Sequence, residues 1–333
     1  MPYGDCFILQ WDSVCGVKRT VILDSGTQTA YCKHIRSLLS HITSDIDLWI
    51  ISHSHNDHIG GVLKFADDLN GGILNLRCNR WLFNYIANSD IPISYNQASL
   101  AESVRQSSKL SDFLNNLGFS SKDCAAKAGM TFIIDDVKFT ILSPINLQNI
   151  SEEEKSSPTS FAAAYNTDYN KTIDSFNDNI FIEDTNAMNA GSIAVMVEYA
   201  TKKFLWLSDA CPTNLCYSLK ALGYSKSNPL VCDYITLPHH GSKGNTSKEL
   251  LELLQCTKYI VTADGNNIYN LPSKETLAKI ITHNCSVSES EIEFLFPSSS
   301  ETPYNIFSVD GISVYDKYRF RIKTGVSALN LIN

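Results

Sequence analysis

A short run of ligand-type side chains carries the clearest chemistry in this chain. His53, His55, Asp57 and His58 fall within six positions, and the run together with the pair at 239–240 holds five of the eight histidines. Neutral imidazoles and carboxylates are the ligands that borderline divalent metals such as zinc prefer. The run therefore predicts a metal site.

The segment before the run must position these side chains. Residues 47–52 are apolar and read as a strand, whose alternation would place His53 and His55 on one side. The following turn would bring Asp57 and His58 to a second point, which predicts two metals. A surface loop or an engineered tag is the alternative, but the run is internal and ends in two glycines that suit a turn into a helix.

The run at 53–58 resembles the signature of the metallo-β-lactamase-fold hydrolases. Three further segments resemble pieces of that family in the expected order: an aspartate-serine-glycine strand end at 20–26, a strand at 204–210 that ends in an aspartate, and a late histidine motif at 237–242. Gly-Asp-Cys within 3–9 and His-His-Gly-Ser within 237–242 resemble a narrower group. It contains the hydrolase domain of bacterial competence (DNA-uptake) channels and its stand-alone relatives.

The resemblance implies an α/β fold, a four-layer αβ/βα sandwich, with residues 1–333 forming one domain. Strands interleaved with helices and hairpins fit this fold, and the site would lie at the strand ends. Residues 145–191 are rich in Ser, Asn, Asp and Thr, which suits an insertion or a lid, with disorder as the alternative.

The resemblance also implies two divalent metal ions, Zn²⁺ or Mn²⁺, and a metal-bound hydroxide as nucleophile. His53 and His55 would hold the first ion, Asp57, His58 and His239 the second, and Asp209 would bridge them. Asp57 and His240 are the residues predicted to take part in catalysis.

The adjacent histidines 239 and 240 are the second strongest signal for metal ligands in the sequence. On an extended segment neighbouring side chains point to opposite sides, so we expect only one of the two to bind metal. The family motif favours His239, which leaves His240 as a supporting or proton-donating group. The alternative is a buried histidine pair with satisfied hydrogen bonds.

One departure concerns the first metal, because many family members add a third histidine there. This chain has no histidine between His58 and Asp209. The competence branch carries a polar motif instead, which 189–192 resembles, so Asn189, Ser192 or water would complete the site. An oxygen-richer site favours manganese. The predicted substrate-binding residues are Asn189, Ser192, Ser242 and Lys243.

Composition limits the class of protein. With 44% hydrophobic and 19% charged residues, the 333-residue chain is typical of a globular protein. No apolar run approaches the roughly 18 residues of a membrane span, and ten scattered cysteines without paired metal-type spacing suit reduced thiols. We therefore expect a cytoplasmic protein with no membrane partner. A net charge of −8 argues against binding long nucleic acid through the surface field.

Short strands are expected at 306–309 and 312–323. In the second, the four cations at 317, 319, 321 and 323 alternate with apolar residues, which predicts one cationic strand face. Such a face could contact nucleic acid. The favoured interpretation is a solvated face that protects a sheet edge.

These observations favour a metal-dependent phosphodiesterase or nuclease acting on nucleic acid or a nucleotide. The first alternative is a hydrolase of a carboxylic ester, lactone, thioester or amide. The second is a partner-activated or non-catalytic defence or toxin-type subunit, which would need a protein partner. The sequence predicts neither the exact substrate nor the oligomeric state.

Overall fold

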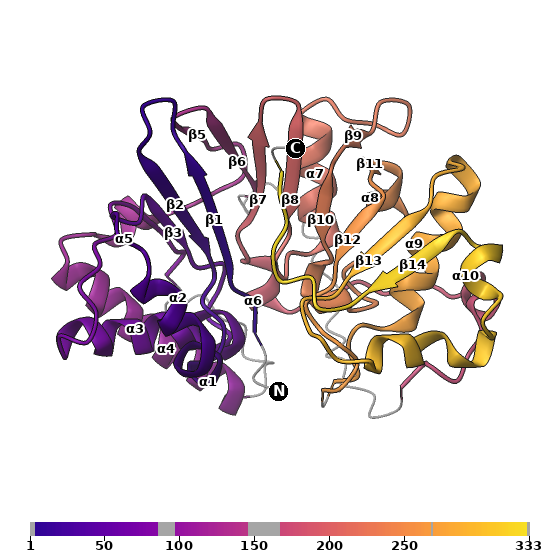
Figure 1. The fold of residues 1–333 in the computed structure, drawn as a ribbon, viewed down its shortest axis with the longest axis horizontal. Coiled ribbons are helices and arrows are strands. Elements are labelled where there is room, and N and C mark those ends of the chain that lie inside the picture. Colours follow the sequence, from indigo (N-terminus) through magenta and orange to yellow (C-terminus); the bar gives the residue numbers. More distant parts are fainter. Residues whose placement is uncertain (1–3, 86–96, 146–166, 268, 332–333) are drawn as a thin grey trace.

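Two β-sheets face each other in the middle of the molecule, and helices cover the outer face of each (Figure 1). The computed structural model describes residues 4–85, 97–145, 167–267 and 269–331. These four layers confirm the αβ/βα sandwich of the metallo-β-lactamase type. Within the described residues, no helix is both long and apolar enough to cross a membrane.

The first half of the chain forms the smaller sheet, in the order β1-β2-β3-β4. β1 and β2 are antiparallel, and the other neighbours are parallel. The strands are β1 (Phe7–Asp12), β2 (Lys18–Leu23), β3 (Leu48–Ile50) and β4 (Trp81–Leu82). Its helices are α1 (Gln28–Ala30), the π-helical turn η1 (Tyr31–Ile35), α2 (Arg36–Ser40), α3 (Asn56–Asn70), α4 (Gln97–Asn116) and α5 (Ser121–Cys124).

The second half forms an eight-stranded sheet in the order β14-β13-β12-β10-β8-β7-β6-β5, antiparallel from β5 to β8 and parallel from β8 to β14. Its strands are β5 (Thr131–Ile134), β6 (Val137–Ser143), β7 (Ala194–Tyr199), β8 (Lys202–Trp206), β10 (Tyr234–Thr236), β12 (Lys258–Ile260), β13 (Ile292–Leu295) and β14 (Phe320–Lys323). A two-stranded ladder joins β9 (Leu230–Val231) and β11 (Leu254–Gln255). The helical elements are η5 (Ile173–Phe176), α6 (Ala187–Ala190), α7 (Pro212–Ala221), η6 (Pro238–Gly241), α8 (Lys248–Glu252), α9 (Lys274–Val287), η7 (Thr302–Asp310) and α10 (Val314–Lys317).

The period-two alternation of the strands explains the layering. In the smaller sheet, Ile22 and Trp49 pack under the helices, whereas Leu23 and Ile50 enter the core between the two sheets. Trp206 of the larger sheet lies fully buried in that same inter-sheet core. Each sheet is therefore apolar on both faces, and polar side chains gather where the strands end.

The prediction of two strands near the C-terminus is partly wrong. Residues 306–309 lie in η7, and 312–323 form α10 and β14 with a break at Arg319, whose φ is 52°. The cations of this segment also pair with acids: Lys317 with Asp174, Arg319 with Glu289, Arg321 with Asp316 and Glu291, and Lys323 with Glu293. A charge-neutralised sheet edge, the favoured interpretation, fits this arrangement better than a nucleic-acid groove.

The polar segment predicted as an insertion lies only partly within the described residues, since 146–166 fall outside them. We call the described part, residues 167–191, the strap. Asp168 accepts hydrogen bonds from the backbone N–H groups of Lys274 and Glu275 at the start of α9, both at 2.9 Å. Glu183 accepts one from the N–H of Thr213 at the start of α7. The strap is thus fixed across two helix N-termini.

Candidate metal centre

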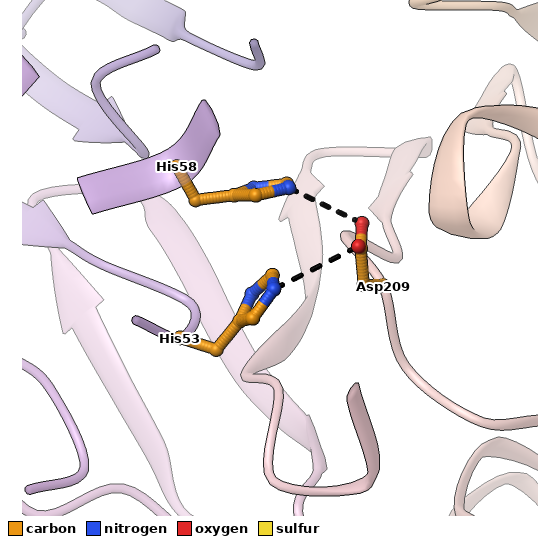
Figure 2. A group of neighbouring side chains, drawn as sticks. All are labelled: His53, His58 and Asp209. Carbon is orange, nitrogen blue, oxygen red and sulfur yellow. Dashed lines mark ion pairs between the residues drawn. The ribbon is translucent and has the colours of Figure 1, made fainter. Parts of the chain in front are cut away.

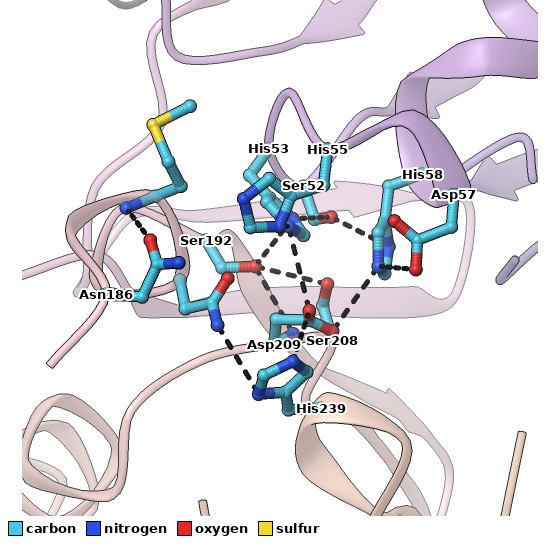
Figure 3. A network of polar contacts seen from close by, with 12 residues as sticks. Ser52, His53, His55, Asp57, His58, Asn186, Ser192, Ser208, Asp209 and His239 are labelled. Carbon is cyan, nitrogen blue, oxygen red and sulfur yellow. Dashed lines mark hydrogen bonds and ion pairs between the residues drawn. The ribbon is translucent and has the colours of Figure 1, made fainter. Parts of the chain in front are cut away.

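The predicted ligands come together at one end of the sandwich, from both sheets (Figure 3). The first motif follows β3 of the smaller sheet and runs into α3, with His55 at the N-cap position. Asp209 follows β8 and the histidine pair follows β10, both in the larger sheet. Because β8 and β10 are parallel neighbours, their carboxyl ends meet at the same edge.

The carboxylate of Asp209 is buried at the centre of the cluster. Its Oδ2 lies 3.7 Å from the Nε2 atoms of both His53 and His239. Its Oδ1 lies 3.4 Å from His58 Nε2 and 4.0 Å from His240 Nε2. Figure 2 shows His53 and His58 reaching the two oxygens from different directions. Each carboxylate oxygen therefore faces its own set of imidazoles.

Two further contacts complete these sets. His55 Nδ1 lies 2.8 Å from His53 Nε2, on the Oδ2 side. Asp57 Oδ2 lies 3.1 Å from His240 Nε2 and 3.7 Å from His58 Nε2, on the Oδ1 side. The donor atoms of His53, His58 and Asp209 lie within 4.8 Å of one another, and so do those of Asp57, His58 and His240.

The histidine pair does not lie on an extended segment, so the expectation that its rings point to opposite sides is wrong. His239 (φ 49°, ψ 50°) and His240 (φ 54°, ψ 23°) are both left-handed, and Gly241 follows with φ 83°. A helical turn of either hand separates successive side chains by about 100°, not 180°. Both rings consequently face Asp209, with centroids 6.0 Å apart.

Three of the histidines each contact a carboxylate through the ring nitrogen Nδ1. The Nδ1 atoms of His58, His239 and His240 lie 2.6 Å from Asp24, 3.1 Å from Asp184 and 3.2 Å from Asp5. Such pairs fix the ring and leave Nε2 free for a metal. None of these three carboxylates was predicted from the sequence as a site residue. Asp5 and Asp24 lay inside the family-like segments, which was a usable signal, whereas nothing marked Asp184.

Asp24, the carboxylate that contacts His58, is itself held in place by hydrogen bonds. It is fully buried, and it accepts hydrogen bonds from the backbone N–H and the hydroxyl of Ser52, at 2.7 and 2.8 Å. Burial raises the pKa of Asp24, and the neighbouring His58 partly offsets that rise. Its φ of 58° is left-handed, so the end of β2 is strained where it meets the first motif.

Opposite charges dominate the electrostatics at the centre. Burial opposes ionisation of Asp57 and Asp209, yet the facing histidines hold the pKa of both carboxyls below the usual value. Burial likewise opposes protonation of the histidines. Even so, the carboxylates raise the pKa of the three histidines at 58, 239 and 240. Burial and adjacent imidazoles lower the pKa of His53 and His55.

The cluster fits divalent metal. His58 Nε2 and Asp209 Oδ1 are both buried and face each other at 3.4 Å without a hydrogen-bond partner. Leaving such atoms unpaired is costly, and a cation between a ring nitrogen and a carboxylate oxygen satisfies both. His53, His55, Asp57, His58, Asp209, His239 and His240 all offer an atom toward the centre.

The predicted substrate-binding residues fall into two groups. Asn189 and Ser192 are buried, and they contact the outer nitrogens of histidine rings, His239 Nδ1 and His53 Nδ1 respectively, both at 3.4 Å. Both therefore contact side chains that are candidate metal ligands. Ser242 is partly exposed and Lys243 is exposed, in the loop that follows the histidine pair.

The first motif and the strands that position it are similar to a known family pattern. Residues 4–73 match the family model of the metallo-beta-lactamase superfamily. Members of this superfamily are generally metal-dependent hydrolases. The matched segment contains Asp5, Asp24 and the whole first motif. It ends well before Asp209 and the histidine pair, which the fold brings to it.

Solved structures that resemble this chain are distant. Zn²⁺-bound PqqB from Methylobacterium extorquens is 12% identical, with a TM-score of 0.33, over 92% of this chain and 81% of that one. CmlA, a diiron β-hydroxylase from Streptomyces venezuelae, is 12% identical, with a TM-score of 0.37, over 84% of this chain and 50% of that one. The MIM-2 metallo-β-lactamase is 13% identical, with a TM-score of 0.32, over 86% and 89%. A comparison with curated proteins gives no match.

Proposed function

We propose that this protein is a binuclear metal-dependent phosphodiesterase. The observation that carries the proposal is the division of ligands around Asp209, whose two carboxylate oxygens face different imidazoles. Two cations would thus share Asp209, with one held by each of its carboxylate oxygens. When bound, two divalent ions, zinc or manganese, activate water, polarise the scissile bond and neutralise charge on the leaving oxygen.

The side chains of this chain have distinct tasks in that reaction. Asp57 and His58 come from the first turn of α3 and would hold one ion, and His53 and His55 the other. For His240 the distances favour a ligand role beside Asp57, in place of the supporting or proton-donating role predicted from the sequence. Asp5 and Asp24 orient rings from behind, and the apolar core below the cluster keeps bulk water from the buried side.

Phosphodiesters are favoured over carboxylic esters by the motifs that flank the centre. Gly-Asp-Cys and His-His-Gly-Ser resemble the competence branch, and both motifs sit at the site, since Asp5 contacts His240. A small substrate, such as a nucleotide or a short phosphodiester, is favoured over long nucleic acid. The net charge is −8, and acids pair with the four cations at 317, 319, 321 and 323.

Turnover of bis-p-nitrophenyl phosphate with added manganese or zinc, beside a panel of carboxylic esters, lactones and thioesters, tests this function. We expect phosphodiester turnover that falls at least about 100-fold in Asp57→Asn and Asp209→Asn. Asp67→Asn is the matched control, because Asp67 is an exposed carboxylate on the same helix as Asp57.

Two results would contradict the proposal in different ways. Turnover of carboxylic esters alone would move the function to that class. Less than one metal ion per chain, with no turnover of any substrate, would favour the partner-activated or non-catalytic subunit. Folding of each variant is checked by circular dichroism, so that loss of activity is not confused with loss of structure.

A further inference from the structure

We propose that His239 is the third imidazole of the first metal site, so that the adjacent pair supplies one ligand to each ion. The family motif assigned His239 to the second ion and left the first without a third histidine. This inference rests on the metal-binding part of the proposed function. It adds that the strap, through Asp184, positions His239.

The distances around Asp209 separate the two histidines. His239 Nε2 and His53 Nε2 each lie 3.7 Å from Oδ2, the oxygen on the side of His55. His240 Nε2 lies 4.0 Å from the other oxygen and 3.1 Å from Asp57. The two histidines therefore lie near different oxygens of the Asp209 carboxylate, His239 near Oδ2 and His240 near Oδ1.

The backbone of η6 holds the pair in this position. The N–H of His239 donates to the carbonyl of Ser208, one residue before Asp209, at 2.8 Å. The carbonyl of Gly241 accepts from the N–H of Ser273 at 3.0 Å, and a Cβ at Gly241 would lie 2.7 Å from a side-chain carbon of Pro272. The turn is thus hydrogen-bonded to the residue that precedes Asp209, and its other side packs closely against Pro272.

The ring of His239 is oriented from the strap. Its Nδ1 lies 3.1 Å from Asp184 Oδ2 and 3.0 Å from Asn245 Oδ1. The amide of Asn189 donates to the same Asp184 oxygen at 2.6 Å, and the backbone N–H of Asp184 donates to the carbonyl of Gly244 at 3.0 Å. With Nδ1 protonated toward these acceptors, the lone pair of Nε2 points toward Asp209.

The ligand sets that result differ in kind. The first site has three nitrogens, from His53, His55 and His239, and one oxygen of Asp209. The second has two nitrogens and two oxygens. Nitrogen-rich sites suit zinc, and oxygen-richer sites accept manganese more readily. This reverses the expectation that the first site is the oxygen-rich one.

Paired alanine variants test the assignment by metal content, without any activity assay. Two ligands of one site should remove the same ion, so His53→Ala/His239→Ala should keep one tightly bound ion per chain. His53→Ala/His240→Ala removes one ligand from each site and should lose both. Elemental analysis after dialysis, and calorimetric titration with Zn²⁺ and Mn²⁺ separately, give the counts and dissociation constants.

The outcomes distinguish this inference from the proposed function. If the wild-type chain binds no metal, the metal-dependent function itself fails. Suppose that the wild type binds two ions, but His53→Ala/His239→Ala loses both and His53→Ala/His240→Ala keeps one. In that case only the assignment of His239 is overturned. Unchanged affinity at both sites in the single variant His239→Ala would overturn it as well. Circular dichroism excludes variants that fail to fold.

The role of Asp184 is tested by Asp184→Asn. We expect zinc affinity at the first site to fall by about 10–100-fold, with the second site unchanged. Glu183→Gln is the matched control, since this neighbouring carboxylate caps α7 and does not contact a histidine ring. The Co²⁺ absorption spectrum of the first site should shift in Asp184→Asn and recover in Asp184→Glu, which a purely structural role would not produce. An unchanged spectrum and affinity would overturn the positioning role.

Discussion

At the scale of single residues, the centre is built from histidines that carboxylates hold from behind. The three supporting carboxylates, Asp5, Asp24 and Asp184, come from before β1, after β2 and the strap. Each leaves the Nε2 of its histidine facing Asp209. Ring orientation is therefore fixed before any metal arrives, which lowers the cost of forming the site.

These pairs predict how the stability of the metal-free protein depends on pH. The pKa values of His58, His239 and His240 are raised. Their contribution is complete below the unfolded value of about 6.5 and is lost as pH rises toward the folded values. His53 and His55 have lowered pKa values, so their contribution grows up to about pH 6.5 and then stays constant.

The melting temperature of chelator-treated protein should consequently be highest near about pH 6.5 and decline as the pH rises above that value. With metal bound, the ions replace the protons and the decline should disappear. Differential scanning fluorimetry at rising pH measures both. A flat profile for the metal-free protein above about pH 6.5 would show that these pairs do not control its stability.

The sequence could indicate the chemistry of the ligands but not all of their partners. His53, His55, Asp57 and His58 are neighbours in the chain, so their spacing alone predicted a metal site. Asp184 contacts His239 across 55 positions, and its neighbours in sequence are polar without any pattern. Such a contact depends on the path of the strap, which composition does not determine.

At the scale of elements, the start of α3 determines where the second pair of ligands lies. The helix packs backbone to backbone on the end of β2: the N–H of Gly61 donates to the carbonyl of Gly26, and that of Ser25 to the carbonyl of His58. A Cβ at Gly61 would overlap with the carbonyl of Ser25. This close approach brings Asp24 against His58.

Gly61→Ala should therefore destabilise the fold by about 1–3 kcal/mol or more, because backbone must move to admit the methyl group. Weaker metal binding should accompany the loss, since the Asp24–His58 pair moves with the helix. Gly191→Ala is the control: its new Cβ would come no closer than 3.4 Å to other atoms, and its φ is −82°. Urea unfolding of the two variants should differ clearly, and equal stabilities would refute the close-packing argument.

The turn at 238–241 marks the limit of prediction at this scale. An extended path was the natural expectation after β10, and it placed the two histidines on opposite sides. Pro238 and Gly241 were visible signals for a turn. Two successive left-handed histidines are, however, an unfavourable backbone state that only the surrounding contacts make accessible.

At the scale of the whole molecule, the order of strands and helices was predictable because their apolar periods are strong. The interleaved strands and helices and the two hairpins, β5 with β6 and β7 with β8, agree with the expected arrangement. The inter-sheet core follows from strands that are apolar on both faces. The C-terminal segment was mispredicted because alternating cations were read as one strand, although Arg319 breaks it.

Metal removal should loosen the molecule as a whole, because each ligand set joins the two sheets. An ion present at 100 times its dissociation constant stabilises the folded state by about 2.7 kcal/mol. Chelation should thus lower the melting temperature by a few degrees per ion lost, and a double variant that lacks both sites should not respond. A chelator effect that persists in the variant His53→Ala/His240→Ala would refute this linkage.

Because the metal ligands join the two sheets at one end, metal binding should affect how fast the protein is degraded in a cell. Chains without metal would open at that end more often and meet proteases more often, since degradation follows the population of open states. The amount of protein present would then track the supply of metal. A shortage of the metal ion would therefore lower the amount of the protein as well as its activity.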